Sequence, residues 1–166
     1  MANRVKSLIQ DLTATDAAVR AAAAEQLAQQ ASTAQDAAVA LVVATGDSDE
    51  TVAEWAVSAL EGLGAPHADD QQRIGELLAS PLESTAYWAA TLLGRLGGDA
   101  APSVAALIGP LERSPHASVR QRAAWALGEI GAAALPASDA LRACAEDSDP
   151  RLSQLARRAL ESFPTK

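Results

Sequence analysis

Apolar positions recur along the chain with helical spacing and with a period of 33 or 34 residues. The phrases "LEGLG", "LGRLG" and "LGEIG" put five copies in register, offset by 33, 33, 34 and 33 residues. One column of these copies contains only leucine, at Leu27, Leu60, Leu93, Leu127 and Leu160. Four residues earlier, a second column contains only alanine, at Ala23, Ala56, Ala89, Ala123 and Ala156. Residues four apart share one side of an α-helix, so each copy predicts an amphipathic helix.

The same helical face is apolar at its beginning and at its end. It begins with Val19, Val52, Thr85, Val119 and Leu152. It ends with Leu63, Leu96, Ile130 and Phe163, and the polar Gln30 takes this place in the first copy. A further amphipathic helix precedes it in each copy, marked by Leu8, Leu41, Ile74, Ile108 and Leu141, with Leu77, Leu111 and Cys144 three residues on. Each copy therefore predicts a helical hairpin, with approximate limits 4–31, 34–64, 69–97, 99–131 and 133–163.

Capping residues mark the ends of the second helices. Aspartates that can accept from free backbone amides precede three of them, at Asp16, Asp49 and Asp149. The phrase Ser-Pro-Leu-Glu at 80–83 is typical of a capping box with Pro81 at the first helical position. We expect a left-handed residue to end three helices, at Gly64, Gly97 and Gly131. Leu82 and His116 fill the aspartate column and Thr85 the valine column, so the third hairpin should be slightly irregular.

The predicted fold is all-α, an α-solenoid of five helical hairpins with about ten helices in one repeat domain over 1–166. A lone hairpin buries too little surface to fold, whereas stacked hairpins share a continuous core. The end copies differ as caps should, with Gln26 and Gln30 in the first and Phe163 followed by Pro164 in the last. The regular columns are also compatible with a designed repeat array. The irregular third hairpin and the scattered tryptophans argue against a designed origin.

Composition narrows the classes of partner. The net charge is −8, and residues 1–83 carry 4 basic and 13 acidic side chains against 9 and 8 in 84–166. Because phosphate contacts require clustered Lys and Arg, we do not expect nucleic acid to bind. The single cysteine excludes an intrachain disulfide, and no apolar run is long enough for a membrane span. We therefore expect a cytoplasmic protein without a membrane partner.

The phrase "HASVRQRAAWALGEIG" at 116–131 resembles the second helix of a HEAT-type repeat. The phrases "DAAVRAAAAEQL" and "DSDETVAEWAVSALEGLG" repeat parts of it. With its short units the chain is most similar to bacterial HEAT-like repeats, a class also found in phycobilisome lyase subunits. The marks of tetratricopeptide and ankyrin repeats are missing. The resemblance covers nearly the whole chain and is specific for fold rather than for chemistry.

In proteins of this family the second helices line a concave groove, and here they carry all five aromatic residues. The predicted partner-binding groove contains Glu54, Tyr87, Trp88, Gln121, Arg122, Trp125 and Arg158. We expect Tyr87 and Trp125 to reach the groove, because large aromatics near arginine are typical of interface hot spots. Trp55 and Trp88 share a column that fits the seam between hairpins, and Arg122 is expected to stack on Trp88. Exposed groove residues and core residues remain alternatives for the tryptophans.

No catalytic constellation is found. His67 and His116 are the only histidines and lack the His-Glu pairs of a HEAT-repeat iron hydroxylase. Cys144 occupies an apolar column and should be a buried, inert thiol. We therefore expect no enzyme activity, no metal and no cofactor. The predicted function is a protein-protein interaction scaffold that binds another protein or a peptide segment, and the alternative is a phycobilin-lyase-like subunit or chromophore-binding helper. The oligomeric state and the partner's identity are left open.

Overall fold

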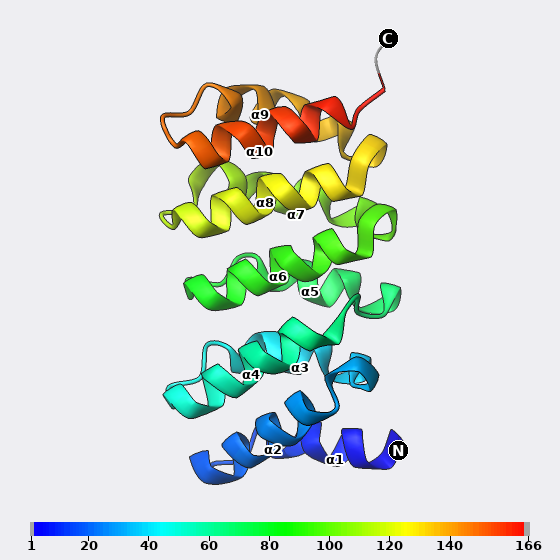
Figure 1. Cartoon of the computed structure of the whole chain (residues 1–166), viewed down its shortest axis with the longest axis vertical. Coiled ribbons are helices and arrows are strands. Elements are labelled where there is room, and N and C mark those ends of the chain that lie inside the picture. Colours follow the sequence, from blue (N-terminus) through cyan, green and yellow to red (C-terminus); the bar gives the residue numbers. More distant parts are fainter. Residues whose placement is uncertain (1, 165–166) are drawn as a thin grey trace. The chain divides into compact units, whose positions relative to one another are not determined.

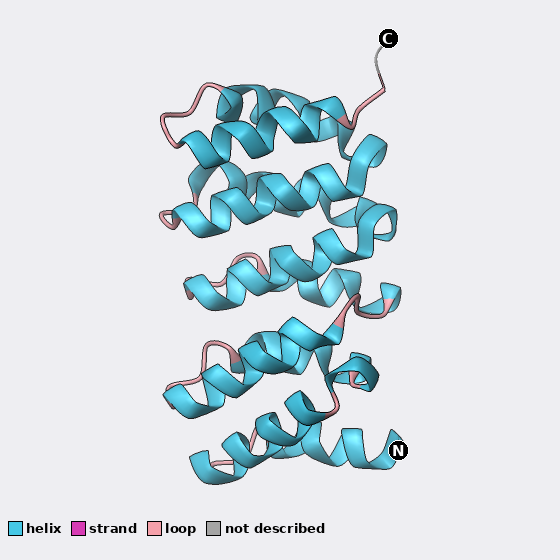
Figure 2. Cartoon of the chain, in the orientation of Figure 1, coloured by secondary structure: helices cyan, strands magenta, loops and turns pink. Residues whose placement is uncertain are grey.

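A computed structural model describes residues 2–164, which contain helices and no strand (Figure 2). Ten α-helices occur in this range, and eight of them have eight residues or more. They are α1 (Ala2–Asp11), α2 (Ala17–Gln29), α3 (Ala38–Ala44), α4 (Glu50–Leu63), α5 (Gln71–Leu77), α6 (Glu83–Leu96), α7 (Val104–Arg113), α8 (Ala117–Ile130), α9 (Ser138–Ala145) and α10 (Pro150–Glu161). Short 3₁₀ segments join them at η1 (Ala31–Thr33), η2 (Gln35–Ala37), η3 (Ala68–Asp70), η4 (Gly97–Ser103) and η5 (Gly131–Ala137). The all-helical hairpin fold predicted from the sequence is confirmed.

The helices form two compact units, one up to His67 and one from Ala68 onward. In the first unit α2 packs on α4, and α1 and α3 lie behind them (Figure 1). In the second unit α6 packs on α8 and α8 on α10, while α5, α7 and α9 form the other layer (Figure 1). Each unit is thus built from stacked hairpins. The single repeat domain over 1–166 stays a prediction.

The core follows the predicted columns closely. All five alanines of the alanine column are buried, as are four of the five leucines, and Leu160 in the last hairpin is half-buried. Val19, in the first hairpin, is 40% exposed. The loss of burial at both ends of the series is expected, because a terminal hairpin has a neighbour on one side only.

The predicted core positions of the first helices are buried except at one residue each in α5 and α7. Leu107 and Leu78 are buried, whereas Ile108 and Leu77, the residues predicted for the core, are half-buried. Leu107 follows Ile74 by 33 residues, so the extra residue of the fourth copy falls after Leu107 and not before it. The columns of the second helices could not locate this insertion, because it lies between the two helices of one hairpin.

Aspartate caps form where they were expected. Asp16 accepts from the backbone N–H of Ala18 at 2.9 Å, and Asp49 accepts from Val52 at 3.2 Å. Asp149 accepts from two amides of α10, at 2.9 and 3.2 Å. These bonds satisfy N–H groups that have no partner within the helix.

The predicted capping box at 80–83 is wrong. Helix α6 begins at Glu83, and Leu82 is its N-cap without a side-chain hydrogen bond. The Ser80 hydroxyl accepts instead from the N–H of Leu82, at 3.2 Å. Ser80 lies two residues before the cap and therefore closes the preceding turn rather than the helix.

Three glycines end α4, α6 and α8 with positive φ. Gly64, Gly97 and Gly131 have φ of 76°, 57° and 70°, as predicted, but their ψ values are −144°, −133° and −136°. This is not the left-handed helical region, where ψ is about +47°. It is a region that residues with a Cβ rarely enter, so glycine is required more strictly here than at an ordinary helix end.

An arginine and an aspartate join neighbouring hairpins in each unit, and we call this pair the Arg–Asp clamp. Arg20 on α2 donates two hydrogen bonds to Asp47, at 2.7 and 2.9 Å, and further bonds to the carbonyls of Ala14 and Thr15. Asp47 also accepts from the N–H of Asp49, the N-cap of α4. The bond from the Arg20 guanidinium holds the pKa of Asp47 below its ordinary value.

The second Arg–Asp clamp repeats this geometry 100 residues further along the chain. Arg120 on α8 donates to Asp147 at 2.7 Å and to the carbonyl of Leu111 at 3.1 Å. Asp147 accepts from the N–H of Asp149 at 2.9 Å. That N–H and the Arg120 guanidinium lower the pKa of Asp147. These contacts give Arg20 and Arg120 a structural role.

Replacing Gly97 by alanine should lower the free energy of unfolding by about 1–3 kcal/mol, because a Cβ strains a residue with positive φ and extended ψ. The nearest atom to an added Cβ is 3.7 Å away, so the cost comes from the backbone and not from a collision. Gly98→Ala is the matched control, since its φ is ordinary and its Cβ would meet nothing within 4 Å. Urea unfolding of both variants measures the difference, and equal stabilities would contradict the prediction.

Removing the first clamp should make the thermal stability of the protein change less as the pH falls into the acidic range. A carboxylate whose folded pKa is depressed stabilises the protein above the unfolded pKa, about 3.9, and this stabilisation is lost as the pH falls through the lower folded value. Arg20→Ala should therefore lower the midpoint of thermal unfolding at pH 7, and the gap to the parent protein should narrow below about pH 4. The control Arg142→Ala removes an exposed pair with Asp139 and should change little. A gap that is the same at every pH would exclude this role for Asp47.

Candidate functional site

Tyr87, Arg122 and Trp125 form a stacked cluster on the second helices of the second unit, which we call the Arg122 sandwich. The guanidinium carbon of Arg122 lies 4.5 Å from the centroid of the Tyr87 ring and 5.0 Å from that of Trp125. Arg122 also donates to the Tyr87 hydroxyl. Arg122 and Trp125 share one face of α8 because they are three residues apart, and Tyr87 is supplied by α6.

Gly94 allows the Trp125 ring to lie across α6. A Cβ at Gly94 would collide with Cζ3 of Trp125 and approach two other ring atoms to 2.9 Å. Gly128, one turn along α8, similarly faces α10, where its Cβ would lie 3.3 Å from Cα of Ala159. Both glycines lie at the contacts between adjacent second helices, where the absent side chain permits close approach.

Two small hollows flank Trp125. The first, of about 250 Å³, is lined by Tyr87, Ser118, Gln121, Arg122, Trp125, Arg151 and Leu155. The second, of about 190 Å³, is lined by Ala124, Trp125, Gly128, Glu129, Leu155, Arg158, Ala159 and Ser162. The structure therefore brings five of the seven predicted site residues to these hollows. Their binding role stays a prediction.

Trp88 and Glu54 are the two predicted site residues that do not line the hollows. Trp88 is only 7% exposed and meets Tyr87 edge to face, with centroids 5.8 Å apart. The predicted stacking of Arg122 on Trp88 is wrong, because Arg95 lies over the Trp88 ring at 5.6 Å and Arg122 stacks on Tyr87 and Trp125. Glu54 is exposed on α4 of the first unit.

Positive charge without a carboxylate partner gathers around Trp125. Within residues 2–164, Arg122, Arg151 and Arg158 form no ion pair with Asp or Glu, whereas Arg20 and Arg120 are held in the clamps. Gln121 is already engaged, since it donates to Asp149 at 2.7 Å and thereby lowers the pKa of that carboxyl. The three arginines thus keep donors available for an acceptor outside the chain.

Arg151 and Leu155 complete the first hollow and were not among the predicted site residues. Three arginines cluster on α10, at Arg151, Arg157 and Arg158. Helix α10 packs on α8, and this packing brings Arg151 next to Trp125. The spacing of four between Arg151 and Leu155 was the available signal, since such residues share a helical face.

The described residues do not gather a set of catalytic or metal-binding groups. No group of three or more His, Cys, Asp or Glu side chains in residues 2–164 could hold a metal ion. His67 pairs with Asp36 at 3.0 Å, and His116, the N-cap residue of α8, pairs with Glu83 at 3.3 Å. Burial raises the pKa of the Cys144 thiol, which disfavours the nucleophilic thiolate. No helix of this range is long and apolar enough to cross a membrane.

Comparison with known proteins identifies the same repeats. A family model described as HEAT repeats matches residues 71–161, more than half of the chain. One similar solved structure is an engineered protein, with 24% identity and a TM-score of 0.66 over 95% of this chain and 78% of that one. A designed armadillo repeat protein in complex with a (KR)4 peptide has 18% identity and a TM-score of 0.67 over 95% and 81%. The complex of CpcE and CpcF of phycocyanin lyase from Nostoc sp. has 23% identity and a TM-score of 0.67 over 98% and 65%. No curated protein matches the sequence.

Contact between Gly94 and Trp125 predicts a strong coupling between these two positions. Gly94→Ala should lower the free energy of unfolding by about 1–3 kcal/mol, because the added Cβ forces the ring to move. In a Trp125→Ala background the same change should cost much less, since the obstructing ring is gone. Urea unfolding of the two single variants and the double variant measures the coupling. Additive costs would mean that the ring does not rest on Gly94 in solution.

Proposed function

The chain belongs to the HEAT-repeat family, and on this premise we propose that it is a non-catalytic scaffold that binds another protein through the face of its second helices. Repeat solenoids of this kind are typical of protein-binding scaffolds. The observation that carries the proposal is the Arg122 sandwich, together with the two neighbouring arginines that lack carboxylate partners. Aromatic and arginine side chains are the commonest hot-spot residues of protein interfaces.

The chemistry of this face favours an acidic partner segment. Arg122 uses one N–H on the Tyr87 hydroxyl and keeps others that can bond a carboxylate. Arg151 and Arg158 extend the positive charge along the α10 side of the same hollows. The solved armadillo neighbour holds a peptide of Lys and Arg. On this chain Arg122, Arg151 and Arg158 carry the same sign as that peptide, so a peptide rich in Asp and Glu fits this face better.

The size of the hollows also favours a polypeptide. Their volumes of about 250 and 190 Å³ are below the range of about 300–1,000 Å³ that is usual for small-molecule sites. Hollows of this size fit single apolar side chains of an extended segment. Trp125, which lines both, would separate two such side chains.

The alternative function is that of a phycobilin-lyase-like subunit or chromophore-binding helper. The phycocyanin lyase complex is a structural neighbour, and arginines beside aromatic rings would suit the propionates and pyrroles of a bilin. The small hollows disfavour it, because a tetrapyrrole needs more enclosed space. Mixing the protein with a bilin separates the two functions, since a chromophore helper should shift the bilin's absorption and a peptide scaffold should not.

Acidic peptides should bind this face with an affinity that depends on Arg122. We expect an array of twelve-residue peptides to show retention of acidic sequences with apolar side chains, and weaker binding at high salt. Arg122→Gln should weaken the best binder at least about tenfold, because a desolvated charge contact is lost. Fluorescence anisotropy of a labelled peptide measures the affinity.

The control for this test is Arg142→Gln, which removes an exposed arginine on α9 that already pairs with Asp139. It should leave peptide affinity unchanged. Preference for basic peptides, or an equal loss in both variants, would rule out recognition through the Arg122 sandwich.

A further inference from the structure

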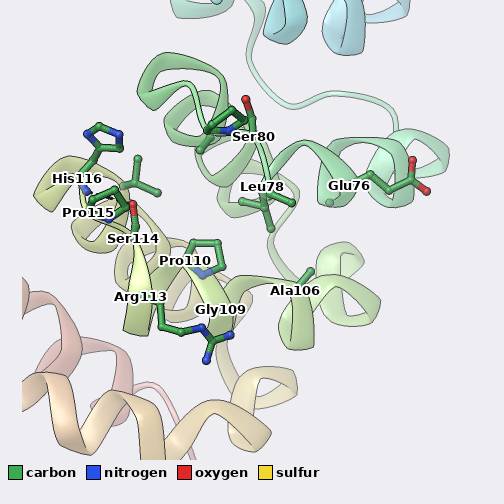
Figure 3. Close-up of a pocket in the computed structure, with 15 residues that line it drawn as sticks. Glu76, Leu78, Ser80, Ala106, Gly109, Pro110, Arg113, Ser114, Pro115 and His116 are labelled. Carbon is green, nitrogen blue, oxygen red and sulfur yellow. Dashed lines mark hydrogen bonds between the residues drawn. The ribbon is translucent and has the colours of Figure 1, made fainter.

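A larger cavity lies between the third and fourth hairpins, away from the Arg122 sandwich. Its volume is about 660 Å³, and its walls come from α5, α6, α7, α8 and the turns that follow α5 and α7 (Figure 3). Leu78, Pro81, Ala86, Pro110 and Val119 provide apolar surface. This volume lies within the usual range for small-molecule sites, about 300–1,000 Å³.

The cavity occupies the place of an Arg–Asp clamp. Ser114 lies two residues before the N-cap of α8 and accepts its N–H at 3.3 Å, as Asp147 accepts the N–H of the N-cap of α10. Thr85 and Val119 occupy the same position of the repeat. Ala86, which follows Thr85, therefore corresponds to Arg120, which follows Val119. Ala86 and Ser114 therefore hold the clamp positions of this junction. Both line the cavity, so two short side chains leave open the space that arginine and aspartate fill elsewhere.

Polar groups at the cavity are mostly hydrogen-bond donors. Ser80 and Ser114 each accept a backbone N–H, which leaves their hydroxyl hydrogens to donate. Arg113 and His116 lie at the rim, where each is already paired with a carboxylate, Arg113 with Glu112 at 3.0 Å and His116 with Glu83 at 3.3 Å. Glu76 is the one carboxylate that lines the cavity, at the end opposite His116 (Figure 3). An apolar wall with donors at one end suits an apolar ligand that carries an anionic group.

We propose that this cavity binds a small monocarboxylate with an aliphatic or aromatic body. The carboxylate accepts from the Ser80 and Ser114 hydroxyls, whose hydrogens remain to donate. The body contacts Leu78, Pro110 and the neighbouring small residues, from which it removes apolar surface from water. The repeat provides this site by omitting a clamp.

Octanoate is the probe for this site, and calorimetric titration measures its binding. We expect saturable binding of one octanoate per chain and no comparable binding of octylamine, which has the same apolar length and a positive charge. The double variant Ala86→Arg with Ser114→Asp rebuilds the clamp and should weaken octanoate at least about tenfold, because the new side chains fill the cavity. Its midpoint of thermal unfolding should not fall.

Two further variants keep the test decisive. Ala86→Met fills the cavity without new charge and should also weaken octanoate, even if the charged double variant does not fold. Tyr87→Ala with Trp125→Ala removes the Arg122 sandwich and should leave octanoate affinity unchanged, which separates this site from the proposed peptide-binding face. Equal binding of octylamine, unchanged binding to both filled variants, or no octanoate binding by the parent protein would overturn the proposal.

Discussion

Close approach of the second helices is the constraint on which the rest of this structure depends. A hairpin cannot cover its own apolar face, so its second helix must press against the next one. Alanines at 0% exposure line these contacts, and Gly128 brings α8 against the backbone of α10. At Gly94 the absence of a side chain likewise leaves room for the Trp125 ring. The tight core and the aromatic cluster on its surface therefore arise from one pattern of small residues.

Two arginines of α8 show how helical position decides what a residue does. Arg120 and Arg122 are two apart and so point to different sides of the helix. Arg120 reaches the turn before α10 and donates its hydrogen bonds to Asp147 and to the Leu111 carbonyl. Arg122 contacts the rings of Tyr87 and Trp125 and donates to the Tyr87 hydroxyl. It forms no ion pair with a carboxylate of residues 2–164. A structural contact and the proposed recognition contact thus lie on one turn of helix.

The sequence predicted what depends on periodicity and missed what depends on side-chain direction. Invariant columns located the hairpins and their core, and the aspartate caps followed from local chemistry. The prediction that Arg122 stacks on Trp88 was wrong because Tyr87 and Trp88 are adjacent in the sequence. The repeat alignment does not show which of the two rings an arginine of the next hairpin contacts. The cavity was missed because it follows from what Ala86 and Ser114 lack, which becomes visible only beside the clamps of other junctions.

The placement of the Arg–Asp clamps bears on how such an array opens. In a linear stack the terminal hairpins should fray first, because each is held from one side. Here the clamps join the first hairpin to the second and the fourth to the fifth, where fraying would begin. The junction of the third and fourth hairpins has a void in the corresponding place. The clamps therefore restrain the first and the last junction, whereas the junction of the third and fourth hairpins lacks this restraint at the place where the proposed ligand would bind.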